Sequence, residues 1–388
     1  MILLIIFLFT VIASAQVDIF GYYESEYDHI QLANKSYNFG YNKLRLDLES
    51  RPNENVMVGA NINFQIFHGK QEWDIVDFIP EYLEIDSAPF SISDSMYLDN
   101  IYLRTSFQRF DFTIGKQPIS LGTGYAWNPL DIFNRKDLID PTYEQAGINA
   151  LRMEIPVMDG GTLDIIIEPD STWDMSSKLI QLKSSQGSFD FSLNGGNQYH
   201  LIPDGNSGYA YDHVFFGGGS IVGELWEFGL WGETLWSLAA DNNFGEVVFG
   251  IDHTFNNGVY LMTEYFHNSL GAEKNEVTFD HYLYNFSGET HSLMQNYLFA
   301  MGMYNLTNYI SGSLLVFGNL DDQSFILAPQ LNWDAFEDVT VSAWVSQSFG
   351  ENDTEFGIQD LALRFRICLL YTSPSPRDRT RSRMPSSA

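Results

Sequence analysis

Apolar and polar residues alternate one by one along several stretches of the chain. In residues 56–66, one set of positions holds mainly Val, Ala, Ile and Phe, and the positions between hold mainly Met, Gly, Asn and Gln. The same alternation recurs in residues 43–49, 339–346 and 360–367. A period of two predicts β-strands with one apolar and one polar face. Beyond residue 15 no run of 18 apolar residues occurs, so we expect no membrane-spanning helix.

Soluble β-sandwiches alternate in the same way, and two further features favour a membrane barrel. The alternating stretches run for about 9 to 13 residues, the length that a tilted strand needs to cross the hydrocarbon layer. Aromatic residues gather near the ends of stretches, at Tyr22-Tyr23, 37–41, Phe215-Phe216 and Tyr265-Phe266, as in interface girdles. We therefore predict an all-β fold, a transmembrane antiparallel up-and-down β-barrel whose apolar strand faces meet lipid.

Short turns and longer loops follow one another along the chain and allow the strands to be counted. Short turns are expected near residues 51–55, 108–109, 158–161, 185–187, 222–223, 256–258, 306–308 and 335–338. Longer segments lie near residues 29–36, 68–96, 119–146, 169–176, 197–210, 235–243, 269–295, 318–323 and 349–356. Eight turns and nine loops predict about 18 strands, within a range of 16 to 18, and place both ends of the barrel on the short-turn side.

The two ends of the sequence differ from the part between them. Residues 1–15 form an apolar run that ends in Ala13-Ser14-Ala15, which is typical of a secretory signal peptide, although no Lys or Arg precedes the run. Residues 368–388 carry four Arg and one Asp and resemble the translation of a sequencing adaptor, with a genuine basic tail as the alternative. We therefore assign residues 16–367 to the barrel and expect closure to be compromised, because the alternation stops at Ile367.

Composition limits the functional classes. Without residues 368–388 the chain has 16 basic and 49 acidic side chains, a net charge of −33, and it has no cysteine. This acidity argues against binding of nucleic acid, and the absence of cysteine excludes a disulfide framework. No metal or other cofactor is expected, because the histidines are scattered and Asp131, Asp137 and Asp140 lack the spacing of a calcium loop.

Several charged residues occupy the polar positions of their strands and are predicted to line the lumen. The basic ones are Lys43, Arg45, Arg104, Arg152, Arg364 and Arg366, and the acidic ones are Asp47, Glu49, Glu154, Asp164, Glu168, Asp190, Glu227, Glu233 and Asp252. A basic stripe that faces acidic residues would create a transverse field and select polar solutes. The alternative is that these charges pair and simply hydrate a wide lumen.

The segment from Gly115 to Glu144 is rich in turn-forming residues and is longer than ordinary loops. It resembles porins of the alginate-export and related sugar-porin type at Gly115, Lys116, Gln117, Gly122, Gly124, Trp127, Asn128, Pro129 and Asp131. The resemblance covers about 40 residues and implies that the loop at 119–146 folds inward and constricts the pore. Lys116 has the apolar parity of its strand and is therefore expected at a rim or a bulge.

Two roles are open for the side chains of this loop. Tyr125, Trp127 and Phe133 could stack on sugar rings, with Arg135, Lys136, Asp137 and Asp140 as hydrogen-bonding partners. Alternatively, the aromatic side chains pack on one another and form a small core within the loop.

The favoured function is an outer-membrane channel of a Gram-negative-type bacterium for passive diffusion of small polar solutes, including ions and sugars. A non-conducting adhesion or assembly barrel is the alternative, if loops 68–96 and 269–295 project outward. An enzyme is disfavoured, because the close pairs Asp252–His253 and Asp212–His213 are adjacent on strands and point to opposite faces. The expected partners are membrane lipid and solutes, with a homotrimer as a candidate oligomer.

Overall fold

The computed structural model describes residues 17–32, 35–78, 86–134, 146–203, 209–238, 243–273, 277–287, 290–351, 354–357 and 359–372. The predicted signal peptide and residues 373–388 lie outside this part of the chain. Among the described residues, no helix is both long enough and apolar enough to cross a membrane.

The strands, in chain order, have the following bounds: β1 (Val17–Leu32), β2 (Lys35–Asn53), β3 (Val56–Gly69), β4 (Glu72–Asp74), β5 (Pro89–Ser91), β6 (Ser95–Ser106), β7 (Asp111–Gln117), β8 (Ile148–Met158), β9 (Gly161–Glu168), β10 (Ser177–Gln186), β11 (Phe189–Pro203), β12 (Tyr209–Leu225), β13 (Phe228–Leu238), β14 (Asn243–Thr254), β15 (Tyr260–Asn268), β16 (Asn296–Asn305), β17 (Ile310–Asn319), β18 (Phe325–Phe336), β19 (Val339–Phe349) and β20 (Gln359–Thr372). A 3₁₀-helix, η1 (Ile75–Phe78), follows β4, and the helix α2 (Phe279–Ser287) lies between β15 and β16.

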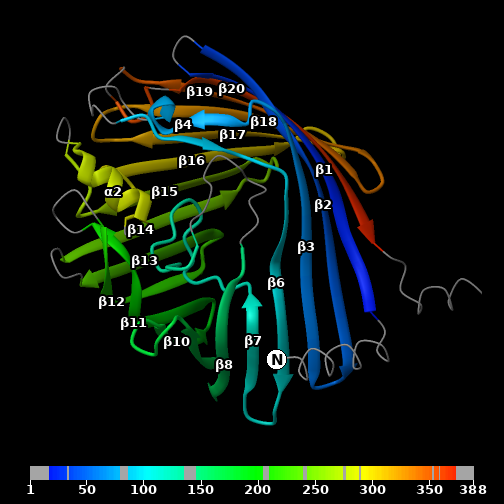
Figure 1. Ribbon diagram of the computed structural model, residues 1–388, viewed down its shortest axis with the longest axis vertical. Helices are drawn as coiled ribbons and strands as arrows, with labels where there is room; N and C mark the ends of the chain where they lie inside the picture. Colours follow the sequence, from blue (N-terminus) through cyan, green and yellow to red (C-terminus); the bar gives the residue numbers. More distant parts are fainter. Residues whose placement is uncertain are drawn as a thin grey trace, which may run out of the picture.

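Eighteen of these strands form one sheet that closes on itself (Figure 1). Each strand pairs antiparallel with the next one in the barrel, and β20 pairs back to β1 from Phe20↔Thr372 onward. The small β4–β5 pair belongs to the connection between β3 and β6. The predicted fold class and the predicted number of strands are therefore confirmed.

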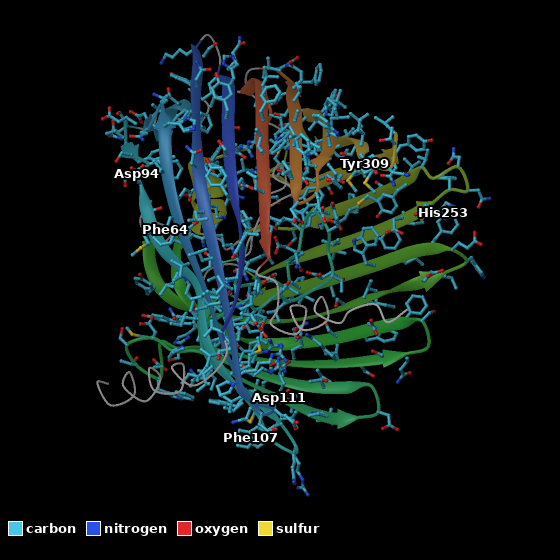
Figure 2. All side chains as sticks on the ribbon, turned by 90° about the vertical axis from the view of Figure 1, so that its right-hand side faces the viewer. Phe64, Asp94, Phe107, Asp111, His253 and Tyr309 are labelled. Carbon is cyan, nitrogen blue, oxygen red and sulfur yellow. The ribbon has the colours of Figure 1, made fainter. Side chains whose placement is uncertain are left out.

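The outer face of the barrel carries large apolar side chains that are exposed along many strands, among them Phe64, Leu193, Phe249 and Phe365. Figure 2 places Phe107, His253 and Tyr309 at the hairpin ends of the short-turn rim. At this rim Trp226, in the turn between β12 and β13, is 83% exposed. An apolar surface of this extent is unfavourable in water and is typical of strands that face lipid between aromatic girdles.

The aromatic pairs proposed for the girdles are divided between the two faces of the wall. Phe215 and Tyr265 are exposed, whereas their neighbours Phe216 and Phe266 are buried. This division follows from the strand geometry, because successive side chains point to opposite faces.

Two sequence predictions about strand length and closure were wrong. The expected loop at 29–36 is instead a hairpin in which β1 reaches Leu32 and β2 begins at Lys35. The barrel also closes, because β20 continues past Ile367 and its residues Cys368 and Leu369 pair with both β1 and β19. Leu369 and Tyr371 continue the outward apolar parity of Phe365 and Ile367, which allows the pairing to extend. The adaptor origin of residues 368–388 stays a prediction.

Candidate functional site

The connection after β7, residues 118–134, folds into the barrel interior (Figure 1). The indole of Trp127 is 3% exposed and stacks on Phe266 of β15, with ring centroids 5.2 Å apart and planes 9° apart. Tyr297 of β16 and Phe317 of β17 contact the same indole. The loop therefore packs on the inward side chains of β15–β17 and does not extend from the barrel.

A second apolar contact holds the ends of the same loop. Ile119, Leu121 and Leu130 are buried in a cluster with inward side chains of β8–β10, β12 and β13, namely Ala150, Ile166, Leu179, Phe216 and Leu235. Burial of each large aliphatic side chain contributes about 1.5–3 kcal/mol, so these contacts and the Trp127 stack hold the loop at several points.

Two buried glutamates of the wall accept hydrogen bonds from the backbone of this loop. Glu233 of β13 accepts from the amides of Thr123 at 2.7 Å, Gly124 at 3.1 Å and Leu130 at 2.6 Å. The Glu233 carboxylate thereby accepts hydrogen bonds from backbone amides of a loop segment that forms neither strand nor helix.

Glu264 of β15 accepts hydrogen bonds from three further backbone amides of the loop. It accepts from Tyr125 at 2.6 Å and from Ala126 and Trp127 at 2.8 Å each. The indole Nε1 of Trp231 also donates to Glu264, at 2.5 Å. The carboxylate is fully buried, and four donors surround it, so its desolvation is compensated by charge-assisted hydrogen bonds.

The two glycines of this loop are required by close approach. Gly122 has φ +76°, and a Cβ there would overlap Asn128 Oδ1 and a carboxylate oxygen of Glu233. A Cβ on Gly124 would overlap the carbonyl oxygen of Trp127. The absence of a Cβ thus lets the backbone at these positions come close to the Glu233 carboxylate, which explains why Gly122 and Gly124 occur two residues apart in the sequence.

A second connection, between β15 and β16, also turns toward the wall. Glu246 of β14 is fully buried and lies 2.9 Å from Nδ1 of His291, whose backbone amide donates to the same carboxylate at 3.1 Å. Thr290, Ser292 and Met294 are buried, and α2 contacts β11. An adhesive role would require this loop to project outward. Its described ends instead pack against the barrel wall.

The inner faces of β20 and β1 carry one group of ion pairs, which we call the seam cluster (Arg364, Arg366, Glu24, Glu26 and Asp28). Arg366 Nε donates to Glu26 at 2.6 Å and lies 3.6 Å from Glu24. Arg364 Nε lies 2.5 Å from Asp28. Both guanidinium groups lie about 5 Å from the ring of Trp344 on β19, at 5.1 and 5.0 Å. These pairs join the first and last strands across the seam of the barrel.

Two further groups continue along the same wall. In the bulge cluster (Arg45, Asp47 and Asp99), Arg45 lies 2.8 Å from Asp47 and 3.3 Å from Asp99, where the β3–β6 register shifts. In the β6–β9 cluster (Arg104, Asp111, Arg152, Glu154 and Asp164), the guanidinium–carboxylate distances run from 2.6 to 3.4 Å. Each of the three clusters holds one carboxylate more than it holds guanidinium groups.

The predicted lumen residues are thus brought together differently from the expectation. Glu154 and Asp164 were expected on a wall opposite the basic stripe, but they lie beside Arg152 and pair with it. Neighbouring strands place oppositely charged side chains within reach, and pairing compensates part of their desolvation. Lys43 lies opposite Glu24 in the β1–β2 register, with its ammonium 5.4 Å from the Tyr22 ring.

The other predicted acids divide between the lumen and the rim. Asp252 accepts from the hydroxyl of Tyr260 at 2.9 Å, and Glu168 ends β9 with inward parity. Asp190 is exposed next to a short turn. Glu49, near the β2–β3 turn, pairs with the exposed Arg51 at 2.7 Å. Glu227 was placed wrongly, because it is exposed in the β12–β13 turn with φ +69°.

The predicted loop residues serve mainly to hold the loop itself. Gln117 is buried and donates to Ala150 O at 3.0 Å, and Asn128 donates to Leu121 O at 2.6 Å. Asp131 is buried and accepts from Ser120 at 3.3 Å. Lys116 has outward parity, as expected, and donates to Leu98 O at 2.7 Å beside the β6 bulge.

The aromatic side chains of the loop have different environments. Trp127 has no ring face available to a solute, and Phe133 packs against the second apolar cluster. Tyr125 is 47% exposed, with its ring near Phe299 and its hydroxyl 3.9 Å from Met301 Sδ. Burial of the rest of the side chain raises the pKa of Tyr125. Arg135, Lys136, Asp137 and Asp140 lie outside the described residues.

Sequence reasoning missed the acids that matter most to this arrangement. Glu24, Glu26 and Asp28 alternate with Tyr23, Ser25 and Tyr27, a signal of inward parity that could have identified them. Glu246 and Glu264 gave a weaker signal, because apolar residues occupy both faces of their strands.

The side chains of Asp252 and His253, which are adjacent on β14, point to opposite faces of the barrel wall. Asp252 faces Tyr260, while His253 packs against Phe228 and Phe255. Among the described residues, no group of three or more His, Cys, Asp or Glu side chains is placed to hold a metal ion.

The connection between β19 and β20 contains a carboxyl group that should respond to pH. Burial raises the pKa of Glu355 to about 7, although Tyr297 Oη and Asn319 Nδ2 each donate to it at 2.6 Å. Asp321 and Asp322 nearby raise this pKa further. Since the folded pKa lies above the ordinary value of 4.5, the contribution of Glu355 to stability is complete below that value and is lost as pH rises through about 7.

We therefore expect the amides around Glu355 and Asn319 to exchange hydrogen faster at pH 8 than at pH 5, after correction for the intrinsic rate. Glu355→Gln, which resembles the protonated form, should remove most of this difference. Identical corrected protection of these amides at both pH values in the unsubstituted protein would refute the prediction.

Comparison with solved structures identifies the same architecture in outer-membrane porins. Pseudomonas aeruginosa OccK2 matches with a TM-score of 0.60 and 10% identity, over 92% of this chain and 98% of that chain. P. aeruginosa OccK5 matches at 0.59 and 8% identity, over 92% and 99%. Acinetobacter baumannii OccAB4 matches at 0.56 and 10% identity, over 92% and 98%. The chain has a porin fold.

No protein-family model matches the sequence, and no curated protein is similar enough to it to be counted as a relative. Identities of 8–10% to the porin structures establish the fold and leave substrate and assembly to be argued from this chain's own residues. The resemblance to alginate-export porins stays a prediction.

Proposed function

We propose that the protein is a porin-like channel of a Gram-negative-type outer membrane, through which small polar solutes diffuse passively. The observation that carries this proposal is the polarity of the closed barrel. Its outer face is apolar, whereas one inner wall holds three clusters of ion pairs. A charged inner wall is favourable where water fills the interior and unfavourable in a dry core.

Within the channel, the loop 118–134 is the constriction. It occupies the interior beside β13–β17 and is tied to Glu233 and Glu264, so solutes pass between the loop and the charged wall. Its aromatic contact for a sugar ring would be Tyr125, since Trp127 is covered.

The excess of one carboxylate in the bulge cluster and in the β6–β9 cluster favours cations over anions. Fixed charges of one sign along a pore raise the local concentration of the opposite ion. OccK2 has been crystallised with glucuronate, an anion, and a preference for such solutes is the competing outcome for this chain.

Planar-bilayer recording tests the proposal with the purified full chain. We expect discrete conductance steps and, in a KCl gradient, a reversal potential of the sign set by K⁺. Absence of steps would refute the channel, and a preference for Cl⁻ would refute cation selectivity. A protein that remained monodisperse without detergent would contradict the membrane assignment.

Signal cleavage after residue 15 and a trimeric assembly are further proposals. The mass of the mature protein would decide the first, and the mass of its detergent complex would decide the second.

A further inference from the structure

The interior has two chemically different sides. In a closed ring of 18 strands, strands nine places apart lie across from each other, so β6 faces β15 and β7 faces β16. The β6–β9 cluster therefore lies across from the inward side chains of β15 and β16. Both sets lie in the half of the barrel nearest the short turns.

The side formed by β15, β16 and the loop is apolar and aromatic. Met301 and Met303 of β16 have inward parity with Phe299, and Tyr125 extends over Met301 from the loop. Tyr260 of β15 completes this surface, which we call the aromatic side (Tyr125, Tyr260, Met301 and Met303). Asp252 of β14 accepts a hydrogen bond from the hydroxyl of Tyr260, and Glu264 of β15 is buried beneath the loop.

The opposite side offers carboxylates but no surplus of basic groups. Arg104 and Arg152 are each within 3.4 Å of two carboxylates, and the cluster has a net charge of −1. An anionic solute would have to separate these pairs, whereas a cation meets the surplus carboxylate directly.

We infer that the channel favours small organic cations with an apolar or aromatic body, such as arylalkylamines. This inference rests on the proposed function and specifies its substrate class. The ammonium group would be attracted by the β6–β9 cluster and by the faces of Tyr125 and Tyr260, while the hydrocarbon body would contact the methionines. An uncharged sugar would gain only the ring contact, and a carboxylate would be repelled.

Block of K⁺ current tests this class with three probes: phenethylammonium, ethylammonium and phenylacetate. Phenethylammonium has both features, and each of the others lacks one. Cation–π and apolar contacts at a partly desolvated site are expected to lower its half-blocking concentration roughly five- to tenfold below that of ethylammonium. Phenylacetate should block least.

Substitutions of Tyr125 test whether its ring causes the difference in half-blocking concentration. Tyr125→Ala should bring the half-blocking concentration of phenethylammonium close to that of ethylammonium, and Tyr125→Phe should preserve the difference because the ring remains. Tyr304→Ala is the matched control, since Tyr304 lies on β16 with outward parity and is exposed.

The outcomes separate the two proposals. A protein that gives no KCl conductance refutes both the channel and the substrate class. A conducting protein that phenethylammonium blocks no better than ethylammonium, or that phenylacetate blocks best, refutes the substrate class alone. Since this comparison uses the unsubstituted protein, it does not depend on the folding of any variant.

Discussion

Glu264→Ala should detach residues 125–127 from the barrel wall and raise the single-channel conductance. The substitution removes the acceptor of three loop amides and of the Trp231 indole. Each buried donor left without a partner costs about 1–3 kcal/mol, so the docked position of the loop loses at least roughly 3 kcal/mol. A loss of about 3 kcal/mol lowers the hydrogen-exchange protection of these amides at least roughly hundredfold.

Two substitutions serve as controls for this prediction. Glu264→Gln keeps one carbonyl oxygen as an acceptor and should give an intermediate effect. Glu337→Gln removes the same charge from the exposed turn between β18 and β19 and should leave conductance and exchange unchanged. The anchoring role would be wrong if Glu264→Ala retained the exchange protection of the loop and the conductance of the unsubstituted protein.

Arg366→Met should destabilise the barrel more than any other single loss of a basic side chain. Arg366 is 3% exposed and pairs with Glu26 and Glu24 across the seam between β20 and β1. Removal of one member leaves a buried charge without its partner, which typically costs about 3–5 kcal/mol. The midpoint of urea unfolding in lipid vesicles should fall accordingly.

The matched control for Arg366 is another arginine–glutamate pair. Arg51 is 68% exposed and lies 2.7 Å from Glu49 near a short turn, and Arg51→Met should change stability by less than about 1 kcal/mol. The double substitution Arg366→Met with Glu26→Met should recover much of the loss, because replacement of both charges by apolar groups removes the desolvation penalty. Equal unfolding midpoints for Arg366→Met and Arg51→Met would contradict the seam role.

The interior of the barrel was less predictable than its wall. Six basic residues occupy polar strand positions in the sequence, but the sequence could not show that Glu154 and Asp164 would pair with Arg152 on the same side. The loop could be recognised by its length and glycines, whereas its anchors Glu233 and Glu264 are more than 100 residues further along the chain.

The sequence by itself determined the strand alternation, the number of strands and the parity of most charged residues. These properties are local, because a period of two follows from the geometry of a single strand and each turn from a few residues. Only the tertiary structure decided which acids meet which bases, where the loop docks and that the barrel closes beyond Ile367. Such contacts depend on register and closure between distant segments, as between Glu26 and Arg366, and no local pattern encodes them.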